Sequence, residues 1–337
     1  MKAYKLHAPK SLENFQLGEY EEPTARHHEV KIRVKAVSLN YRDWALANGW
    51  FGYPGEKLPF IPFSDAAGLI TEVGASVTKL KVGDRVAVNF FPDWHDGAFS
   101  AAKTARSLGG STDGVLAEYV CFPEDAVAKV PDSFSFEEAA AFPCAGVTAW
   151  HSLVVEGRLR PTDTVLLQGT GGVSIFGLQI AKLLGAEAII TSSSDEKLAQ
   201  AQALGADHLI NYKHTPNWDE KARELTQGEG ATHVLEVAGQ MARSIKALRA
   251  GGSIFQIGAV GGPNDEAPNL SMVPINTQRV QGIYVGSTQM LTDMLYAFDR
   301  NHLKPIISKT FNFEEAKEAL AYMGSGSHFG KIVVQVS

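Results

Sequence analysis

The 337-residue sequence lacks several features that define whole classes of protein. Its only two cysteines, Cys121 and Cys144, cannot form a disulfide framework and suit a reducing compartment. It has no run of about twenty apolar residues and no apolar signal core, so it predicts neither a membrane span nor secretion. The net charge of −6 argues against nucleic acid or an anionic membrane as a partner. We expect a cytoplasmic protein of two domains.

The most informative stretch runs from Thr164 to Gly185. A short apolar strand leads into a glycine turn, and a helical apolar period follows the turn. Such a turn lets the backbone approach a pyrophosphate, and the helix N-terminus offers free N–H groups to that anion. Ser174 stands where a third glycine is expected, and a turn without a ligand is the alternative. The residues predicted to bind a dinucleotide here are Gly169, Thr170, Gly171, Gly172 and Val173.

The sequence predicts an α/β protein with two kinds of organisation. Residues 1–128 read as short strands and loops, without a βαβ rhythm. From Ser135 helices appear, and strands then alternate with helices, which predicts a doubly wound parallel sheet. We place this domain at residues 129–285 and assign residues 1–128 and 286–337 to a β-rich domain. A long polar loop, residues 91–114, is either a lid or an interface arm.

Several short motifs are spread along the whole chain. They are Ser64-Asp65-Ala66-Ala67-Gly68, Gly83-Asp84-Arg85-Val86, Leu204-Gly205-Ala206-Asp207, Val285-Gly286-Ser287 and His328-Phe329-Gly330-Lys331. With the glycine turn, they make the chain resemble the medium-chain dehydrogenase/reductase superfamily, in its zinc-independent quinone oxidoreductase and enoyl reductase branch. The resemblance implies a Rossmann dinucleotide-binding domain over residues 129–285 and a GroES-like catalytic domain over the remainder.

The resemblance also bears on metal binding. Zinc-dependent relatives carry a cysteine, a histidine–glutamate pair and a later cysteine, and the matching positions here are Asn40, Ser64-Asp65 and Cys144. One thiol, with a hydroxyl in place of the imidazole, makes a poor tetrahedral zinc site. Residues 91–114 contain no cysteine for a structural zinc lobe. We therefore predict no metal, with Cys144 as a small buried side chain.

The second strand of the alternating region predicts NADPH rather than NADH. A chain that prefers NAD usually carries an acid at this strand tip, but three serines stand there instead. The predicted 2′-phosphate contacts are Ser192, Ser193, Lys197 and Tyr212, the last from the resemblance. Ser194 also reads as the cap of a helix whose first turn holds Asp195, an acid near enough to weaken phosphate binding.

The resemblance assigns further cofactor contacts. Thr148, Gly258 and Ala259 are expected near the nicotinamide. Gly286 and Ser287 are expected to hold its carboxamide, and Lys331 to reach the phosphates, with a solvated surface lysine as the alternative.

Without a metal, reduction of a quinone or a conjugated C=C demands the least of the protein. The site has to hold the acceptor and donate to the oxygen on which charge develops, and a proton then reaches the α-carbon. The candidate catalytic residues are Asn40, Tyr41, Tyr53 and Ser64. The tyrosine donor of enoyl reductases matches Phe51, so Tyr53 is the candidate substitute, with a packed aromatic as the alternative.

The sequence therefore predicts an NADPH-dependent, metal-free reductase with a small apolar quinone or enone as its acceptor. The alternatives are an alcohol dehydrogenase or carbonyl reductase of the same superfamily, and a non-catalytic NADPH-binding protein. Trp50, Phe51 and Phe60 suggest an aromatic acceptor pocket, with scattered core aromatics as the alternative. A strand near residues 281–285, at the edge of the parallel sheet, predicts a homodimer.

Overall fold

The computed structural model describes residues 1–50, 58–258 and 267–336, and the chain divides into two compact units. Unit 1 comprises Met1–Val147 and Val285–Ser337, and unit 2 comprises Thr148–Tyr284. The second boundary lies one residue from the predicted one, but residues 129–147 belong to unit 1. They do so because helix α2 (Phe136–Ala140) packs on strands β3 and β4 of that unit.

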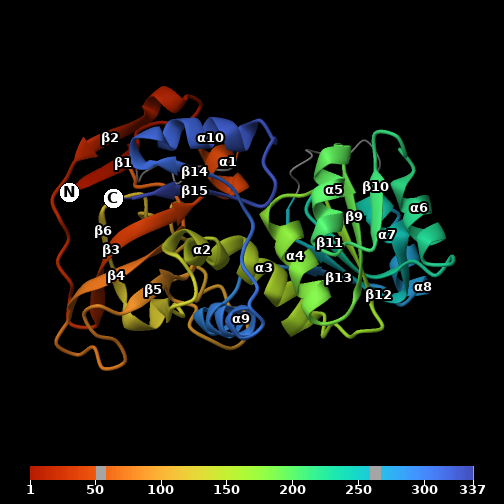
Figure 1. Cartoon of the computed structure of the whole chain (residues 1–337), viewed down its shortest axis with the longest axis horizontal. Helices are drawn as coiled ribbons and strands as arrows, with labels where there is room; N and C mark the ends of the chain where they lie inside the picture. The colour runs from red at the N-terminus through yellow and green to blue at the C-terminus, as the bar shows by residue number, and fades with distance from the viewer. Residues whose placement is uncertain (51–57, 259–266, 337) are drawn as a thin grey trace. The chain divides into compact units, whose positions relative to one another are not determined.

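Unit 2 is built on a parallel sheet with the strand order β10-β9-β8-β11-β12-β13 (Figure 1). The strands are β8 (Thr164–Gln168), β9 (Glu187–Ser192), β10 (His208–Asn211), β11 (Ala231–Glu236), β12 (Leu248–Gln256) and β13 (Arg279–Gly282). The helices are α4 (Gly172–Leu183), α5 (Asp195–Ala203), α6 (Trp218–Leu225), α7 (Met241–Ala247) and α8 (Met272–Ile275). Counted from β8, this is the order 3-2-1-4-5-6 of a Rossmann domain. The predicted fold class is confirmed.

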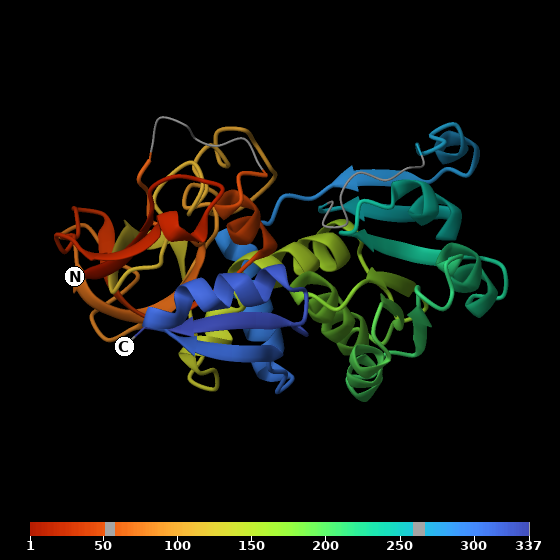
Figure 2. The same cartoon turned by 90° about the horizontal axis from the view of Figure 1, so that it is seen from above.

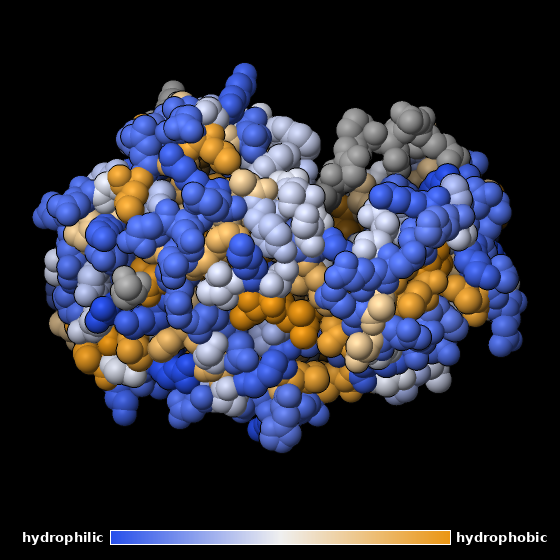
Figure 3. Space-filling view, turned by 45° about the horizontal axis from the view of Figure 1, so that its top comes forward, coloured by the Kyte–Doolittle hydropathy of each residue, from blue (hydrophilic) through white to orange (hydrophobic). Residues whose placement is uncertain are grey.

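Two central strands of this sheet, β8 and β11, are buried along almost their whole length because both of their faces are covered. Every residue of β11 is buried, as is every residue of β8 except the first. Burial on both faces is typical of a parallel sheet, which the alternation of strands with helices in the sequence predicted. The face drawn in Figure 3 is mainly hydrophilic, with smaller apolar patches.

Unit 1 contains a sheet with the order β14-β15-β3-β4-β5-β7, in which β6 also pairs with β3, and a separate pair β1-β2. The strands are β1 (Lys2–Leu6), β2 (Phe15–Glu19), β3 (Glu29–Ser38), β4 (Asp65–Val73), β5 (Arg85–Val88), β6 (Tyr119–Pro123), β7 (Val127–Lys129), β14 (Ile307–Asn312) and β15 (Lys331–Gln335). The helices are α1 (Tyr41–Ala47), α2, α9 (Thr288–Arg300) and α10 (Ala316–Gly324), with short 3-10 turns η1 (Leu12–Asn14), η2 (Glu124–Ala126) and η5 (Phe313–Glu315). Helix α10 lies along β14 and β15 (Figures 1 and 2).

The register of three strands positions the site of unit 1. β3 runs antiparallel to both β4 and β15, with Ser38 opposite Asp65 on one side and Val333 on the other. The end of β3 therefore lies beside the starts of β4 and β15. Residues far apart in the sequence, near positions 40, 65 and 331, meet at this point.

Helices follow Ser135 as predicted, but the stretch from Phe142 to Glu156 is wound irregularly. Helix α3 (Val147–Trp150) is flanked by wide π-helical turns, η3 (Phe142–Gly146) and η4 (His151–Glu156). π-helical turns in a helix are rare and occur frequently at functional sites. Cys144, a predicted match to a zinc ligand, lies in η3.

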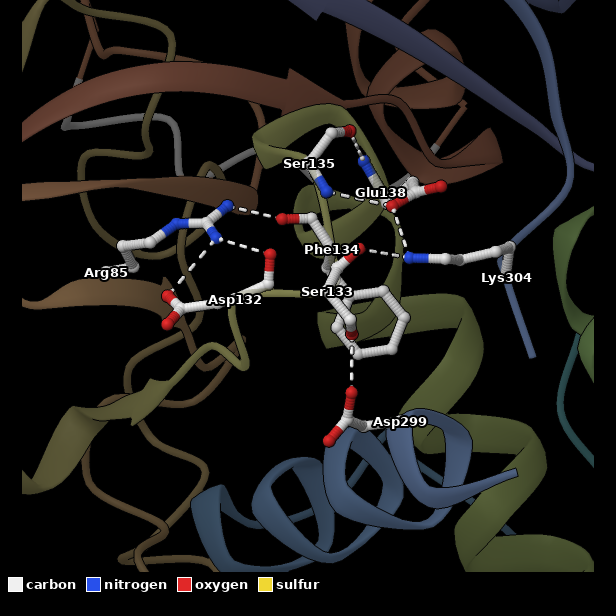
Figure 4. A network of polar contacts seen from close by, with 8 residues as sticks. All are labelled: Arg85, Asp132, Ser133, Phe134, Ser135, Glu138, Asp299 and Lys304. Carbon is white, nitrogen blue, oxygen red and sulfur yellow. Dashed lines mark hydrogen bonds and ion pairs between the residues drawn. The ribbon is translucent and has the colours of Figure 1, made fainter. Parts of the chain in front are cut away.

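A polar network fastens the start of α2, which leads into η3 (Figure 4). Arg85 of β5 donates to the main-chain oxygens of Asp132 and Phe134. Lys304 donates to the oxygen of Ser133 and, at 3.2 Å, to Glu138. The Ser133 hydroxyl donates to Asp299 of α9. The network thereby joins β5, α9 and the segment before β14 to one end of α2.

The long loop at residues 91–114 is packed rather than open along much of its length. Trp94 is fully buried, and its main-chain oxygen accepts from Thr288 N at 2.9 Å. Arg42 donates to the oxygen of Leu108 at 2.7 Å. These contacts fasten the loop to α1 and α9, which is not the arrangement of an open lid.

Candidate functional site

The glycine turn after β8 has the geometry that dinucleotide binding requires. Gly169 has a φ of +73°, a left-handed conformation that glycine adopts without strain. Its N–H donates to the hydroxyl of Thr191 in β9 at 3.2 Å, which ties the turn to the neighbouring strand. Gly171 is the N-cap of α4, so the first N–H groups of this helix lie at the carboxyl edge of the sheet. In open α/β sheets, ligands bind at this edge.

The serine that replaces the third glycine has a structural explanation. The hydroxyl of Ser174 donates to the main-chain oxygen of Gln168 at 2.7 Å, and the side chain is buried. The close approach of helix and sheet occurs one turn later. A Cβ at Gly177 would lie 2.8 Å from side-chain atoms of both Leu167 and Leu235. The packing role of the missing glycine is therefore carried by Gly177.

A buried polar cluster that the sequence analysis missed supports this edge. The amide of Gln168, the last residue of β8, donates to Glu236 of β11 at 3.0 Å and to Ser244 of α7 at 2.8 Å. Glu236 is fully buried, and its carboxylate accepts from the N–H groups of residues 238–240. Its main-chain oxygen accepts from Gly258 N at 3.3 Å. Polar residues at the ends of two adjacent parallel strands were the available signal.

The tip of β9 brings together the predicted 2′-phosphate residues. Tyr212 N donates to the oxygen of Ser192 at 3.0 Å, so the ends of β9 and β10 are joined. Ser194 caps α5, as expected, by accepting from Lys197 N at 3.4 Å. Tyr212 is 42% exposed, and burial lowers the pKa of Lys197. Ser193 lies between these groups in the sequence and is half-buried.

The acid that weakens the NADPH prediction has partners of its own. Asp195 accepts from the Asn211 amide at 2.7 Å, and His214 lies 3.9 Å from its other oxygen. Part of its charge is therefore already engaged at the start of α5.

The remaining predicted cofactor residues lie in both units. Thr148 begins unit 2 and is buried, and Gly258 follows β12, whereas Ala259 lies outside the described residues. Gly286 and Ser287 belong to unit 1. The Gly286 oxygen accepts from Asn89 at 3.3 Å, and the Ser287 hydroxyl caps α9 at Met290 N. Their contacts to a nicotinamide stay predictions.

Unit 1 contains a closed ring of four polar side chains where β3, β4 and β15 meet. Lys331 Nζ donates to Asn40 Oδ1 at 2.6 Å. Asn40 Nδ2 donates to Ser64 Oγ at 3.3 Å, and this hydroxyl donates to Asp65 Oδ1 at 2.6 Å. Asp65 Oδ2 lies 3.7 Å from Lys331 Nζ, which closes the ring. We call Asn40, Ser64, Asp65 and Lys331 the acceptor ring.

The position of Lys331 corrects a prediction. The sequence placed its ammonium on the cofactor phosphates, with a solvated surface lysine as the alternative. The structure shows neither, because Lys331 is 3% exposed and its ammonium also donates to the oxygen of Leu39 at 2.7 Å. β15 pairs with β3 inside unit 1, and this pairing turns the side chain into the ring.

Tyr41, the one tyrosine of the predicted catalytic set that lies among the described residues, is not a member of the ring. Tyr41 begins α1, next to Asn40, and its ring centroid lies 5.4 Å from that of Trp44. Burial raises its pKa. Tyr53 lies outside the described residues, as does Phe51 of the predicted aromatic pocket.

The two described members of that predicted pocket differ in their exposure to solvent. Trp50 is 61% exposed and packs edge-on to Trp44. Phe60 is buried in the core of unit 1 and pairs with Leu6, so its predicted place in a pocket is wrong.

Comparisons with known proteins agree with this architecture. The family model described as "Zinc-binding dehydrogenase" matches residues 172–300, and "Alcohol dehydrogenase GroES-like domain" matches residues 26–132. A zinc-type alcohol dehydrogenase-like protein of Schizosaccharomyces pombe is 41% identical and is covered over 94% of both chains. A solved NAD-dependent alcohol dehydrogenase is 34% identical, with full coverage of both chains and a TM-score of 0.91. The quinone oxidoreductase of Pseudomonas syringae is 27% identical over 99% of both chains, with a TM-score of 0.83.

The chain therefore belongs to the medium-chain dehydrogenase/reductase superfamily of oxidoreductases, and its fold is suited to a nicotinamide cofactor.

One of the two matching family models is described as a zinc-binding dehydrogenase, so the donors at and beside the ring bear on zinc binding. The candidate ligands are an amide oxygen, a hydroxyl, the carboxylate of Asp65 and the thiol of Cys144. Cys144 is the only sulfur donor in this set, and burial, followed by the charge of Asp65, raises the pKa of its thiol. The Asn40 and Asp65 oxygens already face the Lys331 ammonium. Within the described part of the chain, no three His, Cys, Asp or Glu side chains gather as metal ligands. These residues do not fit zinc.

The carboxyl group of Asp43 is joined to the ring through the main chain of Asn40. One of its carboxylate oxygens accepts from Asn40 N at 2.8 Å, while the other is buried without a hydrogen-bond partner in the described chain. Burial raises the pKa of Asp43 to about 6, against the opposing charge of Arg42. This carboxyl therefore holds its proton more tightly in the folded chain than in the unfolded chain.

The free energy of unfolding should fall as the pH rises from about 4 to about 6, because Asp43 must then ionise inside the folded protein. A pKa raised to about 6 in the folded chain costs about 3 kcal/mol of stability at pH values above the folded and unfolded pKa, and it costs nothing at pH values below both. Asp43→Asn keeps an acceptor for Asn40 N without the charge. Urea unfolding at pH 4, 5, 6 and 7 should show this decline in the native chain and lose it in Asp43→Asn. Asp132→Asn, at a fully exposed side chain, is the control. Equal slopes in the native chain and Asp43→Asn would contradict the assignment.

Proposed function

We propose that this protein is an NADPH-dependent, metal-free reductase that transfers hydride to a quinone or an α,β-unsaturated carbonyl compound. One observation carries the proposal: where the superfamily places catalytic zinc, this chain has the acceptor ring. The ring offers N–H and O–H donors and a buried ammonium, but no ligand set for zinc.

The reaction requires two contributions from the chain's own residues: a hydrogen-bond donor for the acceptor oxygen and a route for the proton. When bound, the nicotinamide supplies a hydride for the β-carbon of the acceptor. Asn40 donates an N–H to the acceptor oxygen, on which negative charge develops. Donation from one amide suits a conjugated acceptor, whose charge spreads over several atoms, better than a saturated ketone. Solvent, Tyr41 or Tyr53 supplies the proton to the α-carbon.

The relatives support both this proposal and its nearest alternative. The Pseudomonas syringae protein is named a quinone oxidoreductase, and a tomato relative, 29% identical over 93% of this chain, is named a 2-methylene-furan-3-one reductase. Other relatives are named alcohol dehydrogenases. Alcohol oxidation through zinc is the alternative, and the ring residues argue against it.

The preference for NADPH rests on the tip of β9. Serines stand where an acid would hold the ribose of NAD, and Lys197 and Tyr212 lie at the same tip. Asp195, the nearby acid, is engaged by Asn211.

The proposal extends to a homodimer through β13. This strand lies at the edge of the sheet of unit 2, and Val280 and Tyr284 are 40% and 52% exposed. Two copies can pair their β13 strands antiparallel about a two-fold axis and form one continuous sheet.

The acceptor class is tested by following NADPH oxidation in the presence of a chelator. The panel is a benzoquinone, a naphthoquinone, an aliphatic enone, an enal and a saturated ketone. We expect turnover of quinones or enones and none of the ketone. Ketone turnover that disappears in chelator would favour the zinc enzyme. Silence across the panel despite tight NADPH binding would favour a non-catalytic NADPH-binding protein.

The cofactor preference is tested with Ser193→Asp, which places a carboxylate at the tip of β9. It should lower kcat/KM for NADPH relative to NADH by about tenfold or more, because like charges repel. Ser271→Asp, on the exposed surface before α8, is the control. A native chain that already prefers NADH, or an unchanged ratio in Ser193→Asp, would contradict the assignment.

The dimer is tested by light scattering. The native chain should have twice the mass of the 36.3 kDa monomer. Val280→Lys should shift it toward the monomer because a charge on an edge strand opposes pairing. A monomeric native chain would refute this extension.

A further inference from the structure

We propose that Lys331 is a positioning residue for the acceptor: its buried ammonium fixes the orientation of the Asn40 amide, so that an N–H of Asn40 is presented to the acceptor's carbonyl oxygen. The inference rests on the proposed function for the identity of the acceptor. It adds a residue that the sequence assigned to a different ligand.

The chemistry of the donors and acceptors fixes the direction of every hydrogen bond in the ring. An ammonium has only N–H donors, so the Asn40 atom 2.6 Å from Lys331 Nζ must be the oxygen. The amide nitrogen then faces the other way, toward Ser64 Oγ at 3.3 Å. That hydroxyl must donate to Asp65, because an ionised carboxylate only accepts. Polarity therefore runs from Lys331 through Asn40 and Ser64 to Asp65.

Asn40 is the most exposed member of the ring, and the contact with the acceptor is therefore assigned to it. Ser64 and Asp65 are fully buried and Lys331 is 3% exposed, whereas Asn40 is 8% exposed. Its amide nitrogen carries two N–H groups, and the bond to Ser64 uses one of them. An amide whose oxygen accepts from an ammonium is also the more polarised donor, since linked hydrogen bonds strengthen one another at low dielectric.

Lys331 is committed within unit 1. Its ammonium faces the Leu39 oxygen at 2.7 Å, Asn40 at 2.6 Å and Asp65 at 3.7 Å. Two of the three N–H groups of the ammonium are therefore engaged in hydrogen bonds, and Asp65 faces the same charge as an ion pair. The competing role is purely structural, in which Lys331 only neutralises the buried charge of Asp65.

The test is a double-mutant cycle in the full-length chain, with kcat measured on the best acceptor of the panel. Lys331→Met and Asn40→Ala should each lower kcat by about tenfold to a hundredfold, approaching the loss of one oxyanion donor. The double variant should be no slower than Asn40→Ala, because an amide already removed cannot be misplaced. The dissociation constant for NADPH should change less than about twofold, and Lys331→Arg should restore part of kcat.

Two further variants separate positioning from stability. Lys331→Met leaves Asp65 charged and buried without its cation, which can unfold the chain. Lys331→Met combined with Asp65→Asn removes both charges, and kcat should stay low. Lys304→Met removes a lysine that pairs with Glu138 elsewhere in unit 1, and it should leave kcat within about twofold of the native value (Figure 4).

Three results would overturn the proposal. One is recovery of kcat in the Lys331→Met, Asp65→Asn chain, which would show a structural role. Another is a large rise in the NADPH dissociation constant with kcat intact, which would return Lys331 to the phosphates. The last is full additivity of Asn40→Ala and Lys331→Met.

If the native chain turns over no acceptor, the proposed function fails and the positioning role is tested separately. In the NADP⁺ complex of chain labelled with ¹⁵N-asparagine, cyclohexanone serves as an unreactive carbonyl probe. A shift of the Asn40 amide signal that disappears in Lys331→Met supports positioning. No shift, or a shift that persists in Lys331→Met, refutes it.

Discussion

The ion pair of Lys331 and Asp65 is the constraint on which the organisation of unit 1 depends. Neither side chain is more than 3% exposed, and removing two such charges from water costs several kcal/mol for each ion. The cost is offset only if every lone pair and proton finds a partner. Asp65 also accepts from Cys144 N at 3.0 Å, and Lys331 donates to the Leu39 oxygen. The partners of this pair are complete only when β3 is in register with β4 and β15 and when η3 lies beside them.

The two units contribute different kinds of information about function. The glycine turn, Thr191 and the Gln168–Glu236 cluster of unit 2 build a rigid carboxyl edge of the kind that binds a dinucleotide. Any member of the superfamily needs such an edge, so it says little about the acceptor. The acceptor ring of unit 1 is the part that departs from the zinc pattern. The ring is therefore the part of the structure that bears on which acceptor the protein reduces.

Local pattern predicted unit 2 well because its signals are local. The strand β8, the glycine turn and the helix α4 are adjacent in the sequence, and the apolar residues of β8 indicate a buried strand. The ring was only half predicted. Asn40 and Ser64 were named by matching the zinc positions, but the place of Lys331 depends on β15 pairing with β3, almost 300 residues apart in the chain. The helix α2 was assigned to the wrong unit because a helical pattern does not show which sheet the helix covers.

The central claim is that an ammonium, rather than a metal ion, is the cation of this site. Its most direct test is the zinc content of the purified protein, measured by mass spectrometry alongside turnover before and after dialysis against a chelator. If the ammonium is the cation of this site, the protein should contain far less than one zinc per chain, and neither chelator nor added zinc should change its activity. About one zinc per chain, with activity that falls on its removal and returns on its addition, would contradict it.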